Sequence, residues 1–255
     1  MNTQEIVAQI KKARDNAQPM DPITNQFPDL DFGQAYQIQR MGRDQLIEGG
    51  ESLSGYKMGL TSRAKQRDVN VFEPIRGYLL ASMALESGDT LETAKRIHTR
   101  VEPEVAVIVG QDIDRLIPMA ELLSCLSWAG PALEILDSRF HGYSFKLADV
   151  IADNTSASGY LTGRENWLDD WEHVRLFGVA IRLNGTVVQT GAPAAVLGDP
   201  LRSVAALLKS VVSEGESLKA GQVVLTGGIT ASVPIKKGDQ VEVHWPGETL
   251  SFGVN

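Results

Sequence analysis

The spacing of apolar residues predicts two helices near the N-terminus. Within residues 3–16, apolar side chains recur on one face of a helix, and polar or charged side chains occupy the other positions. A second helix is expected from Asp31, whose carboxylate can accept a hydrogen bond from the first turn, to about Glu48. These two helices predict a small helical cap region over residues 1–75.

Short runs rich in β-branched residues dominate the rest of the chain, and residues 76–255 are expected to form the core. Strands are expected at residues 55–60, 75–83, 100–110, 132–139, 175–183, 186–191, 223–225, 241–245 and 249–254. Helices are expected at residues 63–70, 118–128 and 200–214, and a strand end or loop at residues 150–156. Because strands follow one another without regular strand–helix alternation, the pattern predicts an α+β fold with a mixed, mainly antiparallel β core.

The strand expected at residues 100–110 carries two carboxylates. Glu102 and Glu104 are two positions apart, so both point to the same face of a strand, where their charges repel. The next β run places Glu134 between two apolar residues, where an unpaired carboxylate is costly. A solvated edge strand would explain Glu102 and Glu104 alone, but the addition of Glu134 favours a divalent cation shared by all three.

The charge of the chain limits its partners. The formal net charge is −8 at pH 7, which argues against nucleic acid and against an anionic membrane surface. No apolar run reaches the length of a membrane span, and the first residues do not resemble a secretory signal peptide. With Cys125 as the single cysteine, neither a disulfide framework nor a thiolate metal site is expected. These features predict a soluble, cytoplasmic globular protein.

Three further places are candidates for chemistry. Lys57 lies in an apolar, glycine-flanked run, where its ammonium either reaches solvent or lies in a site that lowers its pKa. Arg139 closes the strand of Glu134 and can pair with a substrate carboxylate or with Asp137. The glycines that follow Thr226 form either a plain turn or a backbone that approaches a ligand closely.

Seven segments resemble the hydratase and decarboxylase branch of the fumarylacetoacetate hydrolase superfamily. They are GYKMGLTSRAKQ (55–66), EPIRGYL (73–79), RVEPEVAVIVG (100–110), ALEILDSR (132–139), IADNTSAS (151–158), GAPAAVLGDP (191–200) and VLTGGITASVP (224–234). The resemblance covers nearly the full length of the chain. It implies a mixed β-roll core, a small helical N-terminal region and a Mg²⁺ or Mn²⁺ site.

The resemblance also implies roles for individual residues. By position, Glu102, Glu104 and Glu134 match the metal ligands of the branch, and Lys57 matches its catalytic lysine. Contacts with the substrate are expected from Ile75, Arg139, Ser156, Thr226 and Gly227.

Two positions favour a decarboxylase within this branch. Its hydratases typically carry an aspartate at the position of Ile75 and an S-G-A-L-G-like segment near Thr226. The decarboxylases of 2-oxo-3-hexenedioate carry an apolar residue and T-G-G-I-T, as this chain does at residues 226–230. Two departures, Arg76 in place of an aromatic residue and Ala157 in place of a second serine, leave the tail of the substrate open.

The resemblance therefore implies metal-dependent decarboxylation of 2-oxo-3-hexenedioate to 2-hydroxypenta-2,4-dienoate and CO2, in the meta-cleavage degradation of aromatic compounds. A cation with oxygen ligands would polarise the keto group, and Lys57 would either stabilise the oxyanion or orient the substrate. Two alternatives remain: a 2-oxopent-4-enoate hydratase, and a non-catalytic subunit that stabilises a hydratase. A homo-oligomer and a complex with the hydratase of the same pathway are also expected.

Overall fold

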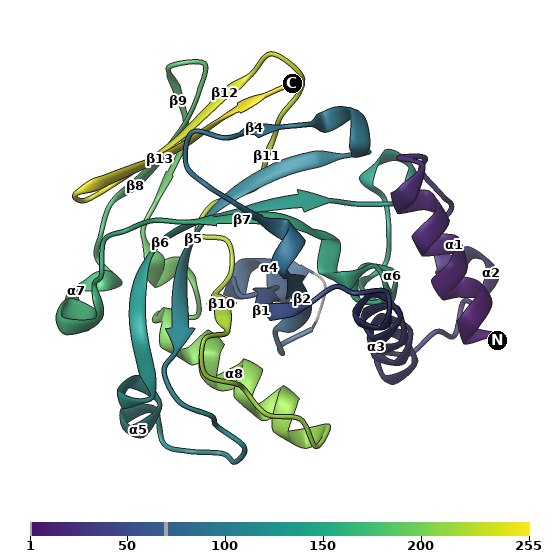
Figure 1. The fold of residues 1–255 in the computed structure, drawn as a ribbon, viewed down its shortest axis with the longest axis horizontal. Coiled ribbons are helices and arrows are strands. Elements are labelled where there is room, and N and C mark those ends of the chain that lie inside the picture. Colours follow the sequence, from purple (N-terminus) through teal and green to yellow (C-terminus); the bar gives the residue numbers. More distant parts are fainter. Residues whose placement is uncertain (1, 69–70) are drawn as a thin grey trace.

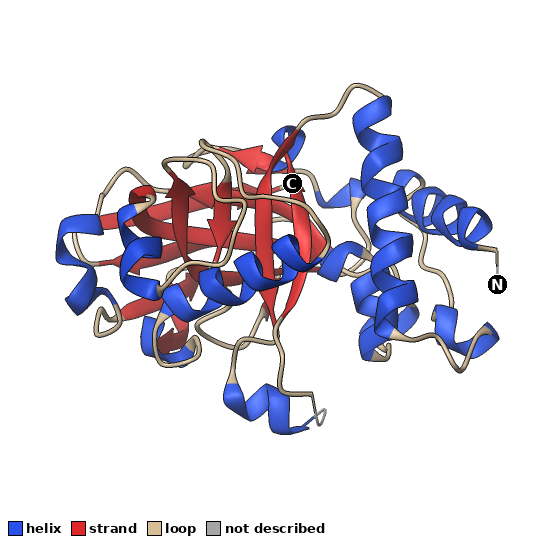
Figure 2. Cartoon of the chain, turned by 90° about the horizontal axis from the view of Figure 1, so that it is seen from below, coloured by secondary structure: helices blue, strands red, loops and turns tan. Residues whose placement is uncertain are grey.

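Two β-sheets form the centre of the molecule, and helices lie outside them and at one end (Figures 1 and 2). The computed structural model describes residues 2–68 and 71–255. The larger sheet contains β1 (Leu53–Gly59), β2 (Ile75–Leu80), β3 (Ala84–Leu85), β5 (Thr99–Val109), β6 (Leu126–Asp137), β7 (Ala157–Thr162), β10 (Val223–Leu225) and β11 (Val233–Pro234). The smaller sheet contains β4 (Thr90–Leu91), β8 (Val179–Leu183), β9 (Thr186–Gly191), β12 (Gln240–Trp245) and β13 (Glu248–Val254).

The order of the strands brings residues that are far apart in the sequence together. The larger sheet runs β2-β1-β10-β5-β6-β7-β3 with β11 beside β5, and the smaller sheet runs β4-β13-β12-β8-β9. The pairs β1–β10, β3–β7 and β4–β13 are parallel, and the other pairs among the described residues are antiparallel. The predicted two-residue turn Asn184-Gly185 joins β8 to β9, with φ of 53° and 78°. The predicted α+β fold with a mixed, mainly antiparallel β-roll core is confirmed.

The helices largely follow the predicted positions. They are α1 (Thr3–Asp15), α2 (Ile23–Gln26), α3 (Phe32–Glu48), α4 (Arg63–Asp68), α5 (Met119–Ser124), α6 (Leu147–Ala152), α7 (Trp171–Val174) and α8 (Pro200–Ser213). Asp31 caps α3 as expected, because its carboxylate accepts a hydrogen bond from the Gln34 N–H at 2.8 Å. The last two residues of the helix predicted at 63–70 lie outside the described residues. Within the described part of the chain, no helix is both long and apolar enough to cross a membrane.

Apolar side chains from both sheets and α8 form the main hydrophobic core. Val105 and Leu133 of the larger sheet and Val243 of the smaller sheet are fully buried there, with Leu208 of α8 packed against them. Strand residues alternate between faces, so the residues between these positions on β5 and β6 point to the opposite face. That opposite face carries the candidate site.

A second apolar cluster joins the N-terminal helices to the rest of the chain. It includes Ile6 of α1, Ile38 of α3, Ile75 of β2 and Ile151 of α6. Figure 2 shows α1 and α3 beside the sheets, at the end of the molecule that carries the N-terminus. Burial of these side chains is the main source of stability for helices of this length, because isolated helices are marginal in water.

Ion pairs fasten the end of α8 to the larger sheet, and α3 to the segment that follows α8. Arg76 of β2 is 1% exposed, pairs with Glu214 and donates from Nε to Ser210 Oγ at 2.9 Å. Arg43 of α3 donates to both carboxylate oxygens of Glu216, at 2.9 and 2.8 Å. Arg76 therefore points away from the glutamate face, and its departure from the family pattern is explained by the packing of α8.

A left-handed turn, η4 (Asn154–Ser156), covers the free edge of β2. Its three residues have φ of 51°, 51° and 58°, a region that asparagine adopts more readily than most residues. Asn154 Oδ1 accepts from the Tyr78 N–H at 2.8 Å, and Asn154 Nδ2 donates to the Tyr78 carbonyl at 3.0 Å. The Thr155 hydroxyl donates to the Arg76 carbonyl at 2.8 Å. The turn thus supplies hydrogen bonds that another strand would otherwise provide.

Two predicted elements were wrong. The helix expected at residues 118–128 ends at Ser124, and the chain from Leu126 onward belongs to β6. Pairing of β6 with the full length of β5 outweighs the local helix preference of these residues. Residues 150–156, expected as a strand end or loop, form the end of α6 and the turn η4, because the edge of β2 offers η4 its hydrogen-bond partners.

We expect Asn154→Ala to destabilise the protein by about 2 kcal/mol or more, because it removes two buried hydrogen bonds and leaves the Tyr78 N–H and carbonyl unpaired. Urea unfolding curves of both proteins measure the difference. The exposed Asn25 provides the control, since Asn25→Ala removes the same side chain without a buried partner. Equal unfolding midpoints for Asn154→Ala and the parent would show that η4 does not depend on this edge pairing.

Candidate metal centre and active site

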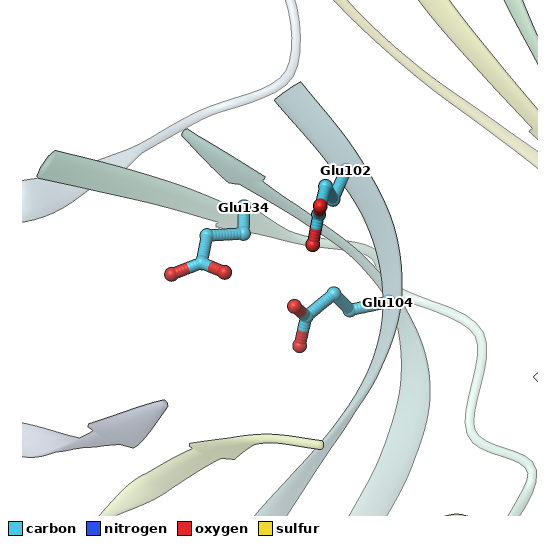
Figure 3. A group of neighbouring side chains, drawn as sticks. All are labelled: Glu102, Glu104 and Glu134. Atoms are coloured by element: carbon cyan, nitrogen blue, oxygen red, sulfur yellow. The ribbon is translucent and has the colours of Figure 1, made fainter. Parts of the chain in front are cut away.

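Three glutamates lie on one face of the antiparallel β5–β6 pair. Glu102 is directly opposite Glu134 in the register, and Glu104 lies two residues further along β5. One carboxylate oxygen of each residue lies within 4.8 Å of those of the other two. Figure 3 shows the three carboxylates pointing into a common space between the strands. The strand alternation predicted from the sequence therefore brings all three together.

Two of the three glutamates carry buried oxygens that accept no hydrogen bond from the described residues. Glu104 and Glu134 are 0% exposed, and Glu102 is 8% exposed. Among the described residues, Glu104 Oε1 and Glu134 Oε2 have no partner, and Glu134 Oε1 has the Lys57 ammonium as its ion-pair partner. Buried carboxylate oxygens without partners cost folding free energy, and a hard divalent cation takes such oxygens as ligands. The three glutamates therefore fit a metal ion.

Burial raises the pKa of two of these carboxyl groups. The pKa of Glu134 rises to about 7 through burial, a rise that Lys57 opposes and Glu102 increases. The pKa of Glu104 lies well above its ordinary value, through burial first and the charge of Glu134 next. In the absence of a cation Glu134 takes up a proton near neutral pH, and the raised pKa of Glu104 also favours its protonated form, so protons and metal ions compete for the same oxygens.

Lys57 of β1 lies beside the glutamates. Its ammonium is 3.0 Å from Glu134 Oε1 and donates to the Thr155 carbonyl at 3.3 Å, and the side chain is 3% exposed. Burial acts to lower the pKa of Lys57, but Glu134, Glu104 and Glu102 together raise it above its ordinary value. Neither outcome expected from the sequence is correct, because the ammonium does not reach solvent and its pKa is not lowered. Lys57 is a buried, charged group.

Two glycines allow η4 to approach Lys57. Gly77 lies opposite Lys57 in the register, and Gly59 lies on the same face of the sheet. A Cβ atom on Gly77 would lie 2.5 Å from the Asn154 carbonyl oxygen, and one on Gly59 would lie 2.9 Å from Thr155 Cγ2. Side chains at either position would push η4 away and remove the carbonyl that Lys57 binds. The spacing of Gly59 and Gly77 in the sequence does not indicate this role, because η4 is distant in the chain.

The segment after β10 lies directly against the glutamates. The Gly227 N–H donates to Glu104 Oε2 at 2.6 Å, and a Cβ atom on Gly228 would lie 1.9 Å from Glu102 Oε2. The Thr226 hydroxyl donates to the Val105 carbonyl at 2.8 Å, which ties the segment to β5. The close approach of backbone that the glycines permit is therefore used to position two glutamates.

The remaining predicted residues fall into two groups. Ile75 lies on the same face as Lys57, and Ser156 in η4 is buried with a hydroxyl that has no hydrogen-bond partner. Arg139 is not part of the glutamate cluster, because its guanidinium pairs with Asp153 and donates to the Asp153 carbonyl at 2.6 Å. The alternative pairing of Arg139 with Asp137 is wrong, since Asp137 accepts instead from two backbone N–H groups. Contact of Arg139 with substrate stays a prediction.

Sequence reasoning missed two residues near the glutamates. Arg100 precedes Glu102 by two residues on β5 and therefore shares its face. Its guanidinium lies 4.3 Å from the centre of the Tyr143 ring. The alternation that located Glu102 and Glu104 already places Arg100 on this face, whereas no local pattern brings Tyr143 there.

Comparison with known proteins agrees with the family resemblance that the sequence motifs indicate. Residues 54–253 match the model of the fumarylacetoacetate (FAA) hydrolase C-terminal family. A 4-oxalocrotonate decarboxylase from Pseudomonas putida is 36% identical over 252 residues, which cover 97% of this chain and 95% of the relative. A 2-keto-4-pentenoate hydratase from Paraburkholderia xenovorans is 32% identical over 242 residues, which cover 94% of this chain and 90% of the relative.

Solved structures show the same fold. The 4-oxalocrotonate decarboxylase from Pseudomonas putida G7, complexed with magnesium and adipate, superimposes with a TM-score of 0.94 at 33% identity, covering 100% of this chain and 99% of that chain. Its complex with calcium and acetate gives a TM-score of 0.93 with the same identity and coverage. The chain therefore belongs to the fumarylacetoacetate hydrolase family, as a lyase of the branch that contains 4-oxalocrotonate decarboxylase.

Proposed function

We propose that this chain is a metal-dependent 2-oxo-3-hexenedioate (4-oxalocrotonate) decarboxylase that forms 2-hydroxypenta-2,4-dienoate and CO2. The observation that carries the proposal is the buried group of three glutamates joined to Lys57, with the apolar Ile75 on the same face. The similarity to a decarboxylase structure that holds magnesium supports it. Glu102, Glu104 and Glu134 would hold Mg²⁺ or Mn²⁺, because oxygen-only ligands suit both ions.

The reaction needs a sink for one electron pair. The C5–C6 bond of the substrate breaks, CO2 leaves, and the pair forms a C4–C5 double bond while the C3–C4 pair moves to C2–C3. The C2 keto oxygen takes the resulting negative charge and then a proton. When bound, Mg²⁺ or Mn²⁺ would supply Lewis-acid polarisation of that keto group. The buried ammonium of Lys57 stabilises the developing negative charge, since few water molecules screen it there.

Other residues of the face position the substrate. Ile75 provides an apolar wall for the C6 carboxylate, which is solvated less well there than in water and is lost as neutral CO2. The hydroxyl of Ser156, which has no protein partner, offers one hydrogen bond to the substrate. Thr226 and Gly227 keep the backbone close to Glu104 and so shape the same space.

Two other functions are tested against this proposal. Hydration of a pentenoate requires a base that directs water to C4, and position 75 offers no carboxylate for this task. A non-catalytic scaffold has no use for buried carboxylate oxygens that accept no hydrogen bond from the described residues, such as Glu104 Oε1, because they cost stability. Self-association, a complex with a hydratase of the same pathway and a location in the cytoplasm remain predictions that accompany the proposed function.

An assay of the purified protein with Mg²⁺ separates the three functions. We expect loss of the enone absorbance of 2-oxo-3-hexenedioate with stoichiometric release of CO2. Addition of water to 2-hydroxypenta-2,4-dienoate without CO2 release would identify a hydratase. Inactivity towards both substrates, with the metal bound, would leave the scaffold function.

Metal affinity should depend on pH. Because the pKa of Glu134 is about 7 without metal and that of Glu104 is also raised, protons must leave before the cation binds. We expect the Kd for Mg²⁺ to be about tenfold or more higher at pH 6 than at pH 8. Calorimetric titration at both pH values, in buffers of different ionisation enthalpy, measures affinity and proton release together. A Kd that is the same at both pH values would contradict this assignment of the ligands.

Lys57→Met tests the buried ammonium while keeping most of the side-chain volume. We expect a loss of turnover of about 100-fold or more, because one preorganised charge at the developing oxyanion is removed. The measurement is the steady-state kcat at saturating Mg²⁺, together with a urea unfolding curve. Lys219→Met provides the control, because Lys219 is exposed and pairs with Asp112 elsewhere on the surface. A kcat close to that of the parent would remove Lys57 from the mechanism.

Ile75→Asp tests the apolar wall for the C6 carboxylate. A like charge next to this carboxylate opposes binding, and the cost corresponds to about tenfold or more in affinity. We therefore expect kcat/KM for decarboxylation to fall at least about tenfold below that of Ile75→Asn, which is equally polar but uncharged. Magnesium affinity and thermal unfolding check that the site and the fold survive. If both variants decarboxylate equally well, Ile75 does not face C6.

A further inference from the structure

Arg100 lies at the end of the glutamate face. In the register of the larger sheet it lies opposite Leu136 of β6 and Pro234 of β11, and its side chain is partly exposed. A step of two residues along a strand is about 6.6 Å, so the side chain of Arg100 starts one row from that of Glu102. A small ligand bound at the glutamates therefore lies within reach of the Arg100 guanidinium.

The guanidinium of Arg100 is oriented but not neutralised. It stacks over the Tyr143 ring at 4.3 Å, and Nη1 donates to Ser232 Oγ at 3.3 Å. These two contacts, which the described residues give Arg100, carry no negative charge. By contrast, Arg43 and Arg139, which are buried, each pair with a carboxylate. A guanidinium has five N–H donors, and among the described residues one hydrogen bond, to Ser232, uses those of Arg100.

Tyr143 lies close enough to both Arg100 and Glu102 for their charges to affect its pKa. It ends η3 (His141–Tyr143), where Gly142 and Tyr143 have φ of 64° and 57°. The pKa of Tyr143 is raised, through burial first and the charge of Glu102 next, while Arg100 and Lys57 act in the opposite direction. The edge-on contact with Phe145, at 5.2 Å between ring centres, holds the Tyr143 ring in place.

The two carboxylates of the proposed substrate place different demands on the site. The C6 carboxylate must lose its charge as CO2 leaves, so an arginine bound to it would stabilise the ground state and oppose the reaction. The C1 carboxylate keeps its charge throughout, so an arginine can bind it without raising the barrier. The apolar Ile75 lies beside Gly59 and Lys57, whereas Arg100 lies beside Glu102. The two ends of the face thus differ as the two ends of the substrate do.

We propose that Arg100, held by Tyr143 and Ser232, binds the C1 carboxylate of a 2-oxo acid and so directs C6 towards Ile75. This inference rests on the proposed function for the identity of the substrate. The ligand class is the 2-oxo carboxylates in general, because each of them carries the C1 carboxylate, with or without a second carboxylate. Arg100 is a specificity-determining residue in this arrangement, and Tyr143 positions it.

Two unreactive acids separate C1 binding from C6 binding. We would titrate 2-oxopentanoate, which has only the C1 carboxylate, and 2-oxoadipate, which has both, into the protein at saturating Mg²⁺. For Arg100→Met we expect both acids to bind more weakly by the same factor, at least about tenfold, because both lose one charge-assisted contact. Arg100→Lys should recover part of this affinity, since it keeps the charge but not the planar fork of donors.

Arg96→Met is the matched control. Arg96 is also half-buried and lies on the preceding loop, but it donates to Ser158 Oγ at 3.0 Å and to the Glu92 carbonyl at 2.8 Å. We expect this variant to bind both acids as the parent does. Magnesium affinity and urea unfolding of each variant show whether the fold and the glutamates are intact. If Arg100→Met does not fold, Arg100→Gln, which can keep the bond to Ser232, replaces it.

Each other outcome overturns the inference. Weaker binding of 2-oxoadipate alone would mean that Arg100 binds the C6 carboxylate, and unchanged binding of both acids would make it a packing partner of Tyr143.

In kinetic terms we expect Arg100→Met to raise KM more than it lowers kcat, because the C1 contact is equally present in ground and transition states. The binding assays need no turnover. A parent protein that binds both acids but releases no CO2 would refute the proposed function and leave the binding role of Arg100 to be judged separately.

Discussion

Three carboxylates and one ammonium share a buried space on the β5–β6 face, and the balance of their charges constrains the rest of the structure. Glu104 and Glu134 are fully buried, and burial raises the pKa of both. Lys57 supplies one positive charge, which cannot neutralise both Glu104 and Glu134 when both are ionised. These two buried carboxylates therefore favour added positive charge, from protons or from a divalent cation. Burial, which raises the pKa of Glu104 and Glu134, is therefore also what favours binding of a cation.

The surrounding backbone is arranged to keep these charges at close range. The glycines after Thr226 bring an N–H group to Glu104, and the left-handed turn at Asn154 brings a carbonyl group to Lys57. A Cβ atom at Gly228 would lie against the Glu102 carboxylate, and one at Gly77 would lie against the Asn154 carbonyl. Three consecutive residues with positive φ cost free energy, and the hydrogen bonds of Asn154 to the edge of β2 offset part of that cost. The strain is thus located where it positions the proposed catalytic group.

The two ends of the site carry different side chains. Lys57 and the apolar Ile75 lie towards β1 and β2, and Arg100 with Tyr143 lies at the end of β5 next to Glu102. A symmetric dicarboxylate could bind such a face in two ways, but a reaction that removes only one carboxylate needs a single orientation. The contrast between the apolar side chain of Ile75 and the cationic side chain of Arg100 gives the proposed reaction a physical basis for that choice. The family comparison alone does not provide it, because decarboxylases and hydratases both match this chain.

Much of this arrangement was determined by the sequence itself. Alternation along residues 100–110 put Glu102 and Glu104 on one face. The two-residue turn at Asn184-Gly185 and the apolar stripe of α8 also follow from short sequence patterns. Such features depend on residues close together in the chain, so their spacing suffices to predict them.

The tertiary structure alone decided the partners of the charged and polar side chains. It paired Arg139 with Asp153, directed Arg76 to Glu214, and buried Lys57 with a raised pKa instead of a lowered one. It also extended β6 back to Leu126, against the helix preference of that segment. These outcomes depend on the order and register of strands from distant parts of the chain, and local sequence patterns do not encode which strands become neighbours.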